Sequence, residues 1–105
     1  MFSSFIEVIT ESIFPAPVYK SYGTRIAAEE FEPAGFRLTL GLKDVKLALA
    51  AAENKAVPMQ VASVLRDHAL SALARGMGDL DWSAIARVAA EDAGLKPVAA
   101  FTPQR

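Results

Sequence analysis

The sequence contains no cysteine and a single histidine, and both shortages restrict its chemistry. Without cysteine there is no disulfide framework and no thiolate nucleophile or metal ligand. That composition fits a reducing cytoplasm. The one histidine, His68, has no second histidine or cysteine with which to share a metal ion, so a core or interface role is favoured over a ligand role. We therefore expect no metal site in this chain.

A run of basic residues and a long apolar segment are also missing. The 11 Lys and Arg are offset by 12 Asp and Glu, giving a formal net charge of −1. Scattered basic residues offer no electrostatic footprint for nucleic acid or an anionic membrane. The opening segment 1–14 has no basic n-region and is interrupted by Glu7 and Glu11, so we expect neither a signal peptide nor a membrane span. These absences predict a cytoplasmic protein without nucleic-acid or membrane partners.

The nucleotide-binding and hydrolase motifs are incomplete. Gly76-Met77-Gly78 begins a GxG pattern, but Asp81 stands where the third glycine would be, and the segment follows a predicted helix rather than a strand. A dinucleotide fingerprint needs that strand, a tight turn and a helix N-terminus. The sequence also has no phosphate-binding GxxxxGK[ST] loop and no serine in a nucleophile elbow. By these tests the chain alone holds no complete catalytic site.

The sequence does contain apolar residues at helical spacing. It has 105 residues, of which 52% are apolar, enough for one domain with a modest core. Proline and glycine interrupt the pattern at short intervals, and no stretch alternates convincingly like a strand. We predict an all-α, bundle-like domain over residues 1–105, of about five helices with a flexible tail at 96–105. The expected helices cover about 4–13, a short stretch from 17, 36–54, 58–75 and 82–93.

The helix expected over residues 36–54 is the one around which the others are arranged. At about 100° per residue its apolar positions form two strips: Leu38, Leu42, Val45, Leu49 and Ala52 in the first, and Leu40, Leu47 and Ala51 in the second. Such a helix is expected to be covered on two sides. Asp44 falls among small residues, which leaves room for a backbone or a ligand to approach its carboxylate.

The last two helices carry their own core faces and caps. The expected core positions are Val61, Leu65, Ala69 and Ala72 in the fourth helix and Trp82, Ile85, Val88 and Ala89 in the fifth. Asp81 is suited to cap the N-terminus of the fifth helix. Glycine in 76–78 and Gly94 are suited to left-handed C-caps.

Three motifs in this order resemble one enzyme family. They are Phe36-x6-Lys43-Asp44 with the following Val-x-Leu-Ala-Leu, then Val57-Pro58-Met59, and finally GMGDLDWSA at 76–84. Together they are similar to the C-terminal domain of the β-hydroxyacid dehydrogenases. That family includes 3-hydroxyisobutyrate, tartronate semialdehyde and 6-phosphogluconate dehydrogenase-like enzymes. The similar region covers roughly residues 4–95.

The resemblance implies an enzyme of two domains. An N-terminal Rossmann domain would bind NAD or NADP, a long interdomain helix would carry a catalytic lysine, and the all-α C-terminal domain would close the cleft and drive dimerisation. The Rossmann fingerprint and that lysine are missing here, and Lys20 and Lys55 stand in the wrong context to replace it. Alone, the chain is therefore expected to hold no catalytic residue, bind no cofactor and be inactive. Its expected partners are the Rossmann domain and a second copy in a homodimer.

The resemblance also assigns three residues to the border of the active site. Phe36 resembles an aromatic residue lining the cleft, Lys43 a lysine near the nicotinamide end of the cofactor, and Asp44 an acidic residue that orients its neighbours. Each has a plainer interpretation from the sequence. Phe36 can be a packing residue, Lys43 a solvated side chain, and Asp44 a carboxylate favoured by the helix dipole.

Two hypotheses for function remain open at this level. In the first, the chain completes the substrate cleft and dimer interface of an enzyme that oxidises a β-hydroxyacid or reduces the corresponding aldehyde acid. In the second, it is a free-standing helical dimerisation module without catalysis, using its first helix and the second strip of the central helix as the interface.

Overall fold

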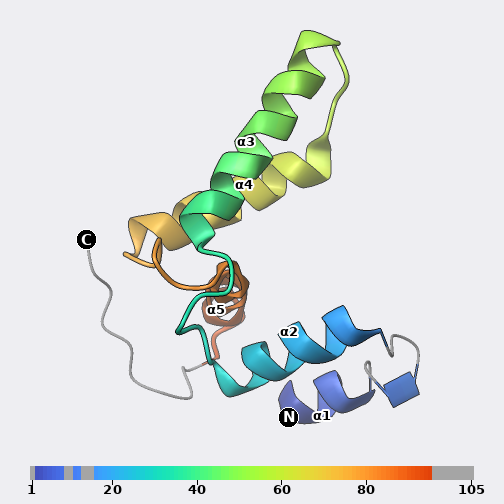
Figure 1. The fold of residues 1–105 in the computed structure, drawn as a ribbon, viewed down its shortest axis with the longest axis vertical. Helices are drawn as coiled ribbons and strands as arrows, with labels where there is room; N and C mark the ends of the chain where they lie inside the picture. The colour runs from blue at the N-terminus through green and yellow to red at the C-terminus, as the bar shows by residue number, and fades with distance from the viewer. Residues whose placement is uncertain (1, 9–10, 13–15, 96–105) are drawn as a thin grey trace.

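The computed structural model describes residues 2–8, 11–12 and 16–95, and over these residues it confirms an all-α domain (Figure 1). The elements in chain order are α1 (Phe2–Val8), α2 (Pro17–Ala28), α3 (Leu38–Asn54), α4 (Gln60–Ala74), the 3-10 helix η2 (Trp82–Ala84) and α5 (Ile85–Asp92). No strand occurs in the described residues, although an isolated antiparallel bridge joins Arg37 to Asp81.

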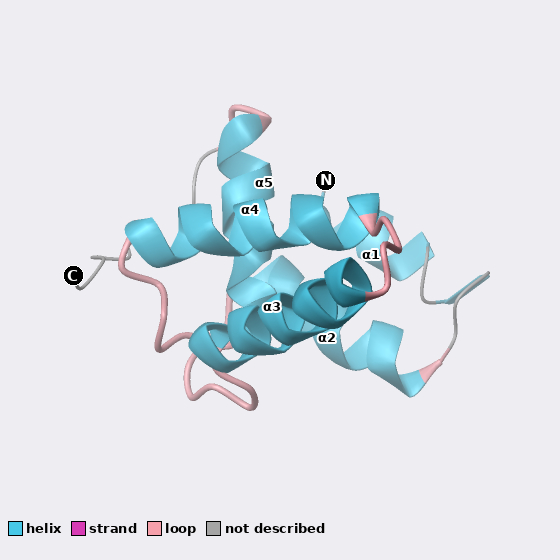
Figure 2. Cartoon of the chain, turned by 90° about the horizontal axis from the view of Figure 1, so that it is seen from above, coloured by secondary structure: helices cyan, strands magenta, loops and turns pink. Residues whose placement is uncertain are grey.

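Helices α3 and α4 form a hairpin that extends away from the other helices (Figures 1 and 2). Helices α1 and α2 lie side by side at the opposite end. Between these two groups lies α5, which contacts α4, while η2 contacts both α2 and α3. The base of the hairpin is thus joined to the rest of the domain, and its tip is free of the other described helices.

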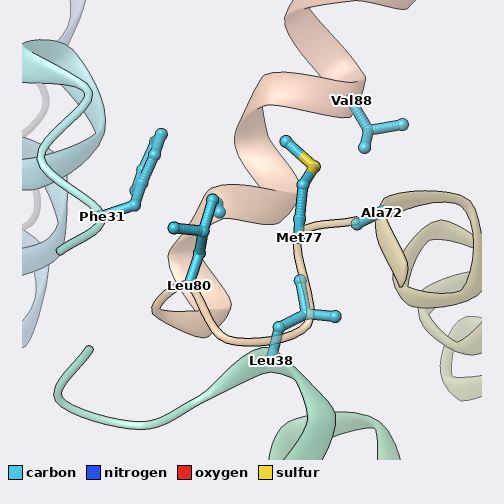
Figure 3. Close-up of a cluster of buried hydrophobic side chains, with 7 residues drawn as sticks. Phe31, Leu38, Ala72, Met77, Leu80 and Val88 are labelled. Carbon is cyan, nitrogen blue, oxygen red and sulfur yellow. The ribbon is translucent and has the colours of Figure 1, made fainter. Parts of the chain in front are cut away.

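The hydrophobic core lies at the base of the hairpin, where loops and four helices meet (Figure 3). Its buried members are Phe31, Leu38, Ala72, Met77, Leu80, Ala84 and Val88. Phe31 comes from the loop after α2, and Met77 and Leu80 come from the turn after α4. Loop residues therefore supply a large part of this core, which fixes the path of both loops.

The two apolar strips predicted on α3 have different outcomes. In the first strip, Leu38 and Leu42 are buried at the base, and Val45 is half-buried further along. The prediction that the second strip is covered was wrong, since Leu40 and Leu47 are 42% and 59% exposed. No described element packs on that side of α3, because the hairpin projects away from the domain.

The core faces predicted for α4 and α5 are partly correct. Ala69 and Val88 are buried as expected. Val61 and Leu65 are 76% and 44% exposed, because α4 begins at the hairpin tip and reaches the core only in its second half. Trp82 is 43% exposed rather than buried. Ala89 is also exposed.

Helix boundaries differ from the sequence predictions by a few residues. Helix α1 ends at Val8 among the described residues, and positions 9, 10 and 13 of the predicted helix lie outside them. The tail predicted at 96–105 also lies outside the described residues. Helix α2 continues through Gly23, which is buried, to Ala28. Gly76 and Gly94 have φ of +81° and +78°, which confirms both as left-handed positions.

Candidate functional site

Two segments run side by side between α2, α3 and α5, and we call them the loop junction: residues 31–39, which end in the first turn of α3, and residues 78–82, which end at the start of η2. Backbone hydrogen bonds join them along their length: Asp81 N–H to Phe31 O (2.9 Å), Trp82 N–H to Phe36 O (2.7 Å), Leu38 N–H to Leu80 O (2.9 Å) and Thr39 N–H to Gly78 O (3.1 Å). This pairing uses the carbonyl of Phe36 and the N–H of Leu38, so the chain is held in an extended pairing on both sides of Arg37. It explains why α3 begins at Leu38 and not at Phe36, as had been predicted.

Asp81 lies at the centre of the loop junction, and its side chain is fully buried. Its two carboxylate oxygens have separate partners. Oδ1 accepts from the backbone N–H of Gly35 at 2.9 Å and of Phe36 at 3.0 Å. Oδ2 accepts from the backbone N–H of Ser83 at 3.0 Å and from its hydroxyl at 2.5 Å. The predicted N-cap is therefore confirmed, and Asp81 also binds the turn that precedes α3.

Arg25, near the end of α2, is the counter-ion of this buried carboxylate. Its Nη1 lies 3.3 Å from Oδ1 of Asp81. Its Nε donates to the carbonyl of Glu30 at 2.8 Å, and its Nη2 donates to the carbonyl of Pro33 at 2.8 Å. A buried charge is tolerated when it is paired and hydrogen-bonded. Arg25 provides the pairing and at the same time fastens the loop that leads to the Gly35-Phe36 turn.

The environment of Asp81 favours its charged form. Burial raises the pKa of the carboxyl, but the hydrogen bonds outweigh it, first from the Ser83 hydroxyl and then from the backbone N–H groups of Phe36, Ser83 and Gly35. The net result is a pKa below the ordinary value of 3.8. Hydrogen bonds to the charged form act in this direction because each donor stabilises the anion. Asp81 is therefore an anion at neutral pH.

Three aromatic side chains, Tyr22, Phe36 and Trp82, form what we call the aromatic cluster. The Phe36 and Trp82 rings meet edge to face, with centroids 5.9 Å apart at 82°. Tyr22 and Trp82 do the same at 6.0 Å and 84°, and the indole Nε1–H of Trp82 donates to the Tyr22 hydroxyl at 3.0 Å. The cluster covers Gly41 of α3, where an added Cβ would lie 3.4 Å from Trp82 Cβ and 3.5 Å from a Phe36 ring carbon. Gly41 thus allows the aromatic rings to lie against the helix.

The structure relates the other two predicted site residues to this cluster through α3. Asp44 follows Gly41 by three positions, so it lies on the same side of the helix about one turn further on. Lys43 points about 100° away from it. Both side chains are exposed, and among the described residues neither side chain makes a hydrogen bond or an ion pair. Asp44 is the seventh residue of α3, beyond the first turn, so the helix-dipole interpretation of this carboxylate does not apply.

A separate hollow lies near the tip of the hairpin. This open groove of about 720 Å³ is lined by residues from both helices and their connection, among them Lys46, Leu49, Glu53, Met59 and Arg66. None of the three predicted site residues lines it. Its distance along α3 from the loop junction separates it from the aromatic cluster, so we do not count it as part of the candidate site.

Two parts of this arrangement are not predicted by any pattern in the sequence. The first is the role of Arg25 as counter-ion of Asp81. Arg25 belongs to no recognised motif, and only its position before an acidic loop distinguishes it from other arginines in the sequence. A second buried ion pair was also missed: Arg87, 7% exposed, lies 3.0 Å from the carboxylate of Glu29 and 5.9 Å from the centre of the Phe31 ring. Arg87 is next to Val88 in the sequence but points about 100° away from it on the helix, outside the face predicted to be buried, so no local signal marked it.

The chain was compared with known protein families and known proteins, and it is similar to one family of dehydrogenases. Residues 2–89 match the family described as NAD-binding of NADP-dependent 3-hydroxyisobutyrate dehydrogenase. The chain belongs to the β-hydroxyacid dehydrogenase family. It is 47% identical over 77 residues to the uncharacterized oxidoreductase YfjR of Bacillus subtilis, covering 73% of this chain and 27% of that protein. It is 32% identical over 80 residues to glyoxylate/succinic semialdehyde reductase 1 of Arabidopsis thaliana, covering 76% and 27%.

The family predicted from the three motifs is therefore confirmed, and the chain spans about a quarter of the length of these relatives, 27% of each. The description of the matching family names NAD binding. In the described residues, the turn at Gly78 does not leave room for a pyrophosphate. A Cβ at Gly78 would lie 2.8 Å from Thr39 Oγ1 and 3.0 Å from Leu73 Cδ1, so this turn is filled by the protein itself.

Two further observations limit the chemistry of the described part of the chain. Within residues 2–8, 11–12 and 16–95 there is no group of three or more His, Asp or Glu side chains that could hold a metal ion. In the same residues, every helix is too short or too polar to cross a membrane.

Proposed function

We propose that this chain is the C-terminal domain of an NAD(P)-dependent reductase and that its loop junction forms one wall of the substrate cleft. The observation that carries this proposal is the aromatic cluster beside Gly41, with the exposed carboxylate of Asp44 about one turn further along the same helix. An apolar wall next to free polar groups is the usual composition of a small-molecule site.

The residues have distinct tasks in this proposal. When bound, the cofactor supplies the hydride, which no protein side chain can supply. Phe36 and Trp82 exclude water from one side of the cleft, which strengthens the electrostatic interactions within it. Asp44 is free to accept a hydrogen bond from a substrate hydroxyl or from a neighbouring donor of the other domain. Lys43 provides a positive charge close to the negatively charged cofactor.

The cofactor and the proton donor are assigned to the part of the enzyme that precedes this domain. The family resemblance implies a catalytic lysine in a helix between the domains, and the filled turn at Gly78 supports a phosphate site elsewhere. The substrate we propose is a small aldehyde acid, because the Arabidopsis relative is named for glyoxylate and succinic semialdehyde. This chain alone should show no turnover with NAD(P)H.

A chimeric enzyme tests the proposal. The quarter of the Arabidopsis reductase that matches this chain is replaced by the chain itself, and NAD(P)H oxidation is measured with glyoxylate and succinic semialdehyde. We expect activity at least about tenfold above that of the reductase lacking this quarter. The control chimera carries Asp92→Asn, an exposed position at the end of α5 that lies outside both the candidate site and the hairpin surface. Full activity of a folded chimera carrying both Phe36→Ala and Asp44→Asn would contradict the proposed cleft.

The exposed apolar residues of the hairpin favour a second, compatible role in dimerisation. Along α3 and α4 the exposed members are Leu40, Leu47, Val61, Val64, Leu65, Leu70 and Leu73. Apolar surface of this extent usually meets a partner. We propose a twofold homodimer through this surface, since most soluble homo-oligomers are of that type. A free-standing dimerisation module would show the same dimer but would leave the chimera without activity.

A further inference from the structure

The two oxygens of Asp81 perform separate tasks, and only one of them is explained by helix capping. An N-cap needs one acceptor for a free N–H of the first turn, and Oδ2 meets that need through Ser83. Oδ1 binds Gly35 and Phe36, which precede a different helix and lie 46 and 45 positions away in the sequence. The bonds to Oδ1 must therefore have another role than capping the N-terminus of η2.

That set of bonds fixes the backbone on which the Phe36 ring is mounted. The N–H of Phe36 donates to Asp81 Oδ1 at 3.0 Å, and its carbonyl accepts from Trp82 N–H at 2.7 Å. The peptide groups on both sides of its Cα are thus held by the neighbouring segment. The ring then meets Trp82 edge to face and contacts Gly41. A change in the Gly35-Phe36 turn would therefore move the Phe36 ring relative to Trp82 and to Gly41.

Arg25 makes this arrangement stiff. Its guanidinium bonds the carbonyls of Glu30 and Pro33 and lies 3.3 Å from Oδ1, the same oxygen that binds the turn. The side chain of Arg25 is 24% exposed, whereas that of Asp81 is 0% exposed. Oδ1 of Asp81 is therefore paired with the guanidinium of Arg25 from α2 and accepts two backbone N–H groups from the turn that precedes α3.

We propose that Asp81, held by Arg25, is a positioning residue for the cleft: its Oδ1 sets the Gly35-Phe36 turn and thereby the place of the Phe36 ring. This inference rests on the proposed function in taking Phe36 to border the cleft. The positioning itself is a property of this chain and can be measured without turnover.

The decisive variant is Asp81→Ser, because a serine hydroxyl can cap a helix but is too short to reach the turn. The measurement is amide hydrogen exchange of Phe36, bonded to Asp81, relative to Leu38, bonded to the carbonyl of Leu80. We expect the Phe36 to Leu38 ratio of exchange rates to rise about tenfold. A merely structural loss would raise both rates together and leave the ratio unchanged. Emission of Trp82, the one tryptophan of the chain, reports on the ring at the same time.

Two further variants keep the test decisive. Ser83→Ala removes a bond to Oδ2 only, so the ratio should stay within about twofold of its original value. Arg25→Met removes the charge that grips Oδ1 from a half-buried position, and it should raise the ratio by about threefold. If Asp81→Ser does not fold, Arg25→Met decides the matter. An unchanged ratio and unchanged Trp82 emission in the folded variants would overturn the proposal.

The same variants in the chimera separate this inference from the proposed function. We expect Arg25→Met to lower kcat/KM for the aldehyde acid by about tenfold. If the exchange ratio rises and kcat/KM does not change, Asp81 positions the turn and the assignment of Phe36 to the cleft is wrong. If neither changes, the positioning role is wrong.

Discussion

The indole of Trp82 donates to the hydroxyl of Tyr22 at 3.0 Å, joining η2 to α2 across 60 positions of sequence. Trp82 also meets the Phe36 ring edge to face. One exposed indole thus connects α2, η2 and the segment that leads into α3. The hydrogen bond to Tyr22 determines which way the indole faces, and this orientation is what the Phe36 ring packs against.

We expect Tyr22→Phe to lower the free energy of unfolding by about 0.5–1.5 kcal/mol, since a net hydrogen bond between side chains is worth that much. The measurement is urea denaturation followed by circular dichroism. Trp82→Phe provides the control through a double-mutant cycle, in which the double variant should lose less than the sum of the two single changes. Strict additivity would mean that the two side chains do not interact in solution.

The lowered pKa of Asp81 predicts a pH dependence of stability. A carboxylate whose folded pKa lies below its unfolded value stabilises the protein above the unfolded value, and this contribution is lost as pH falls through the folded pKa. The free energy of unfolding should therefore fall as the pH is lowered below the ordinary value of 3.8. Chemical denaturation at several pH values between about 5 and 2 measures it.

Asp81→Asn is the matched variant for this prediction. It should be less stable than the original chain at neutral pH, because the amide cannot be an anion for Arg25 and has one acceptor where the carboxylate has two. The difference in free energy of unfolding between the two proteins should become smaller as the pH is lowered. A constant gap down to the lowest pH would show that Asp81 does not contribute the titration.

Gly78 is required by a close approach of α3. A Cβ there would lie 2.8 Å from Thr39 Oγ1 and 3.0 Å from Leu73 Cδ1, so Gly78→Ala should lower the free energy of unfolding by about 1–3 kcal/mol. Thermal and urea denaturation measure this loss. Gly35→Ala is the control, since its Cβ would meet ordinary contact distances of 3.4 and 3.6 Å. Adding Thr39→Ala should restore part of the stability of Gly78→Ala.

The exposed apolar surface of the hairpin predicts self-association. Light scattering at micromolar concentration should give the mass of a dimer for the original chain. A double change of Leu47→Glu and Val61→Glu, at positions 59% and 76% exposed, should give the mass of a monomer. The circular dichroism spectrum should be unchanged, because neither side chain is in the core. A monomeric mass for the original chain would contradict the proposed dimer.

The sequence was sufficient to predict the all-α fold class and several of the core residues at the base of the hairpin and in α5. Periodic residues such as Leu38, Leu42 and Val88 are buried because local spacing and tertiary packing agree there. The second strip of α3 could not be judged from spacing. Periodicity shows which residues share a face but not whether any element covers that face, and the projecting hairpin leaves Leu47 exposed.

The candidate site shows a similar division. Asp81 was recognised as a cap because the signal for a cap is local. Its bonds to Gly35 and Phe36 join distant segments. No local pattern reveals such a pairing, and the same holds for the ion pair with Arg25. The assignment of Phe36, Lys43 and Asp44 to the cleft came from the motif resemblance and remains a prediction.

The spacing of the loop junction has a consequence for how the domain is made. During synthesis the Phe36 turn leaves the ribosome long before its acceptor, which follows 45 residues later. Until then the N–H groups of the turn bond water, while the hairpin of α3 and α4 is free to form from local contacts. The aromatic cluster therefore cannot be completed before residues 81 and 82 have been made. A nascent chain that stops before residue 81 would contain the helices α1 to α4 but would lack the complete aromatic cluster that we propose borders the substrate cleft.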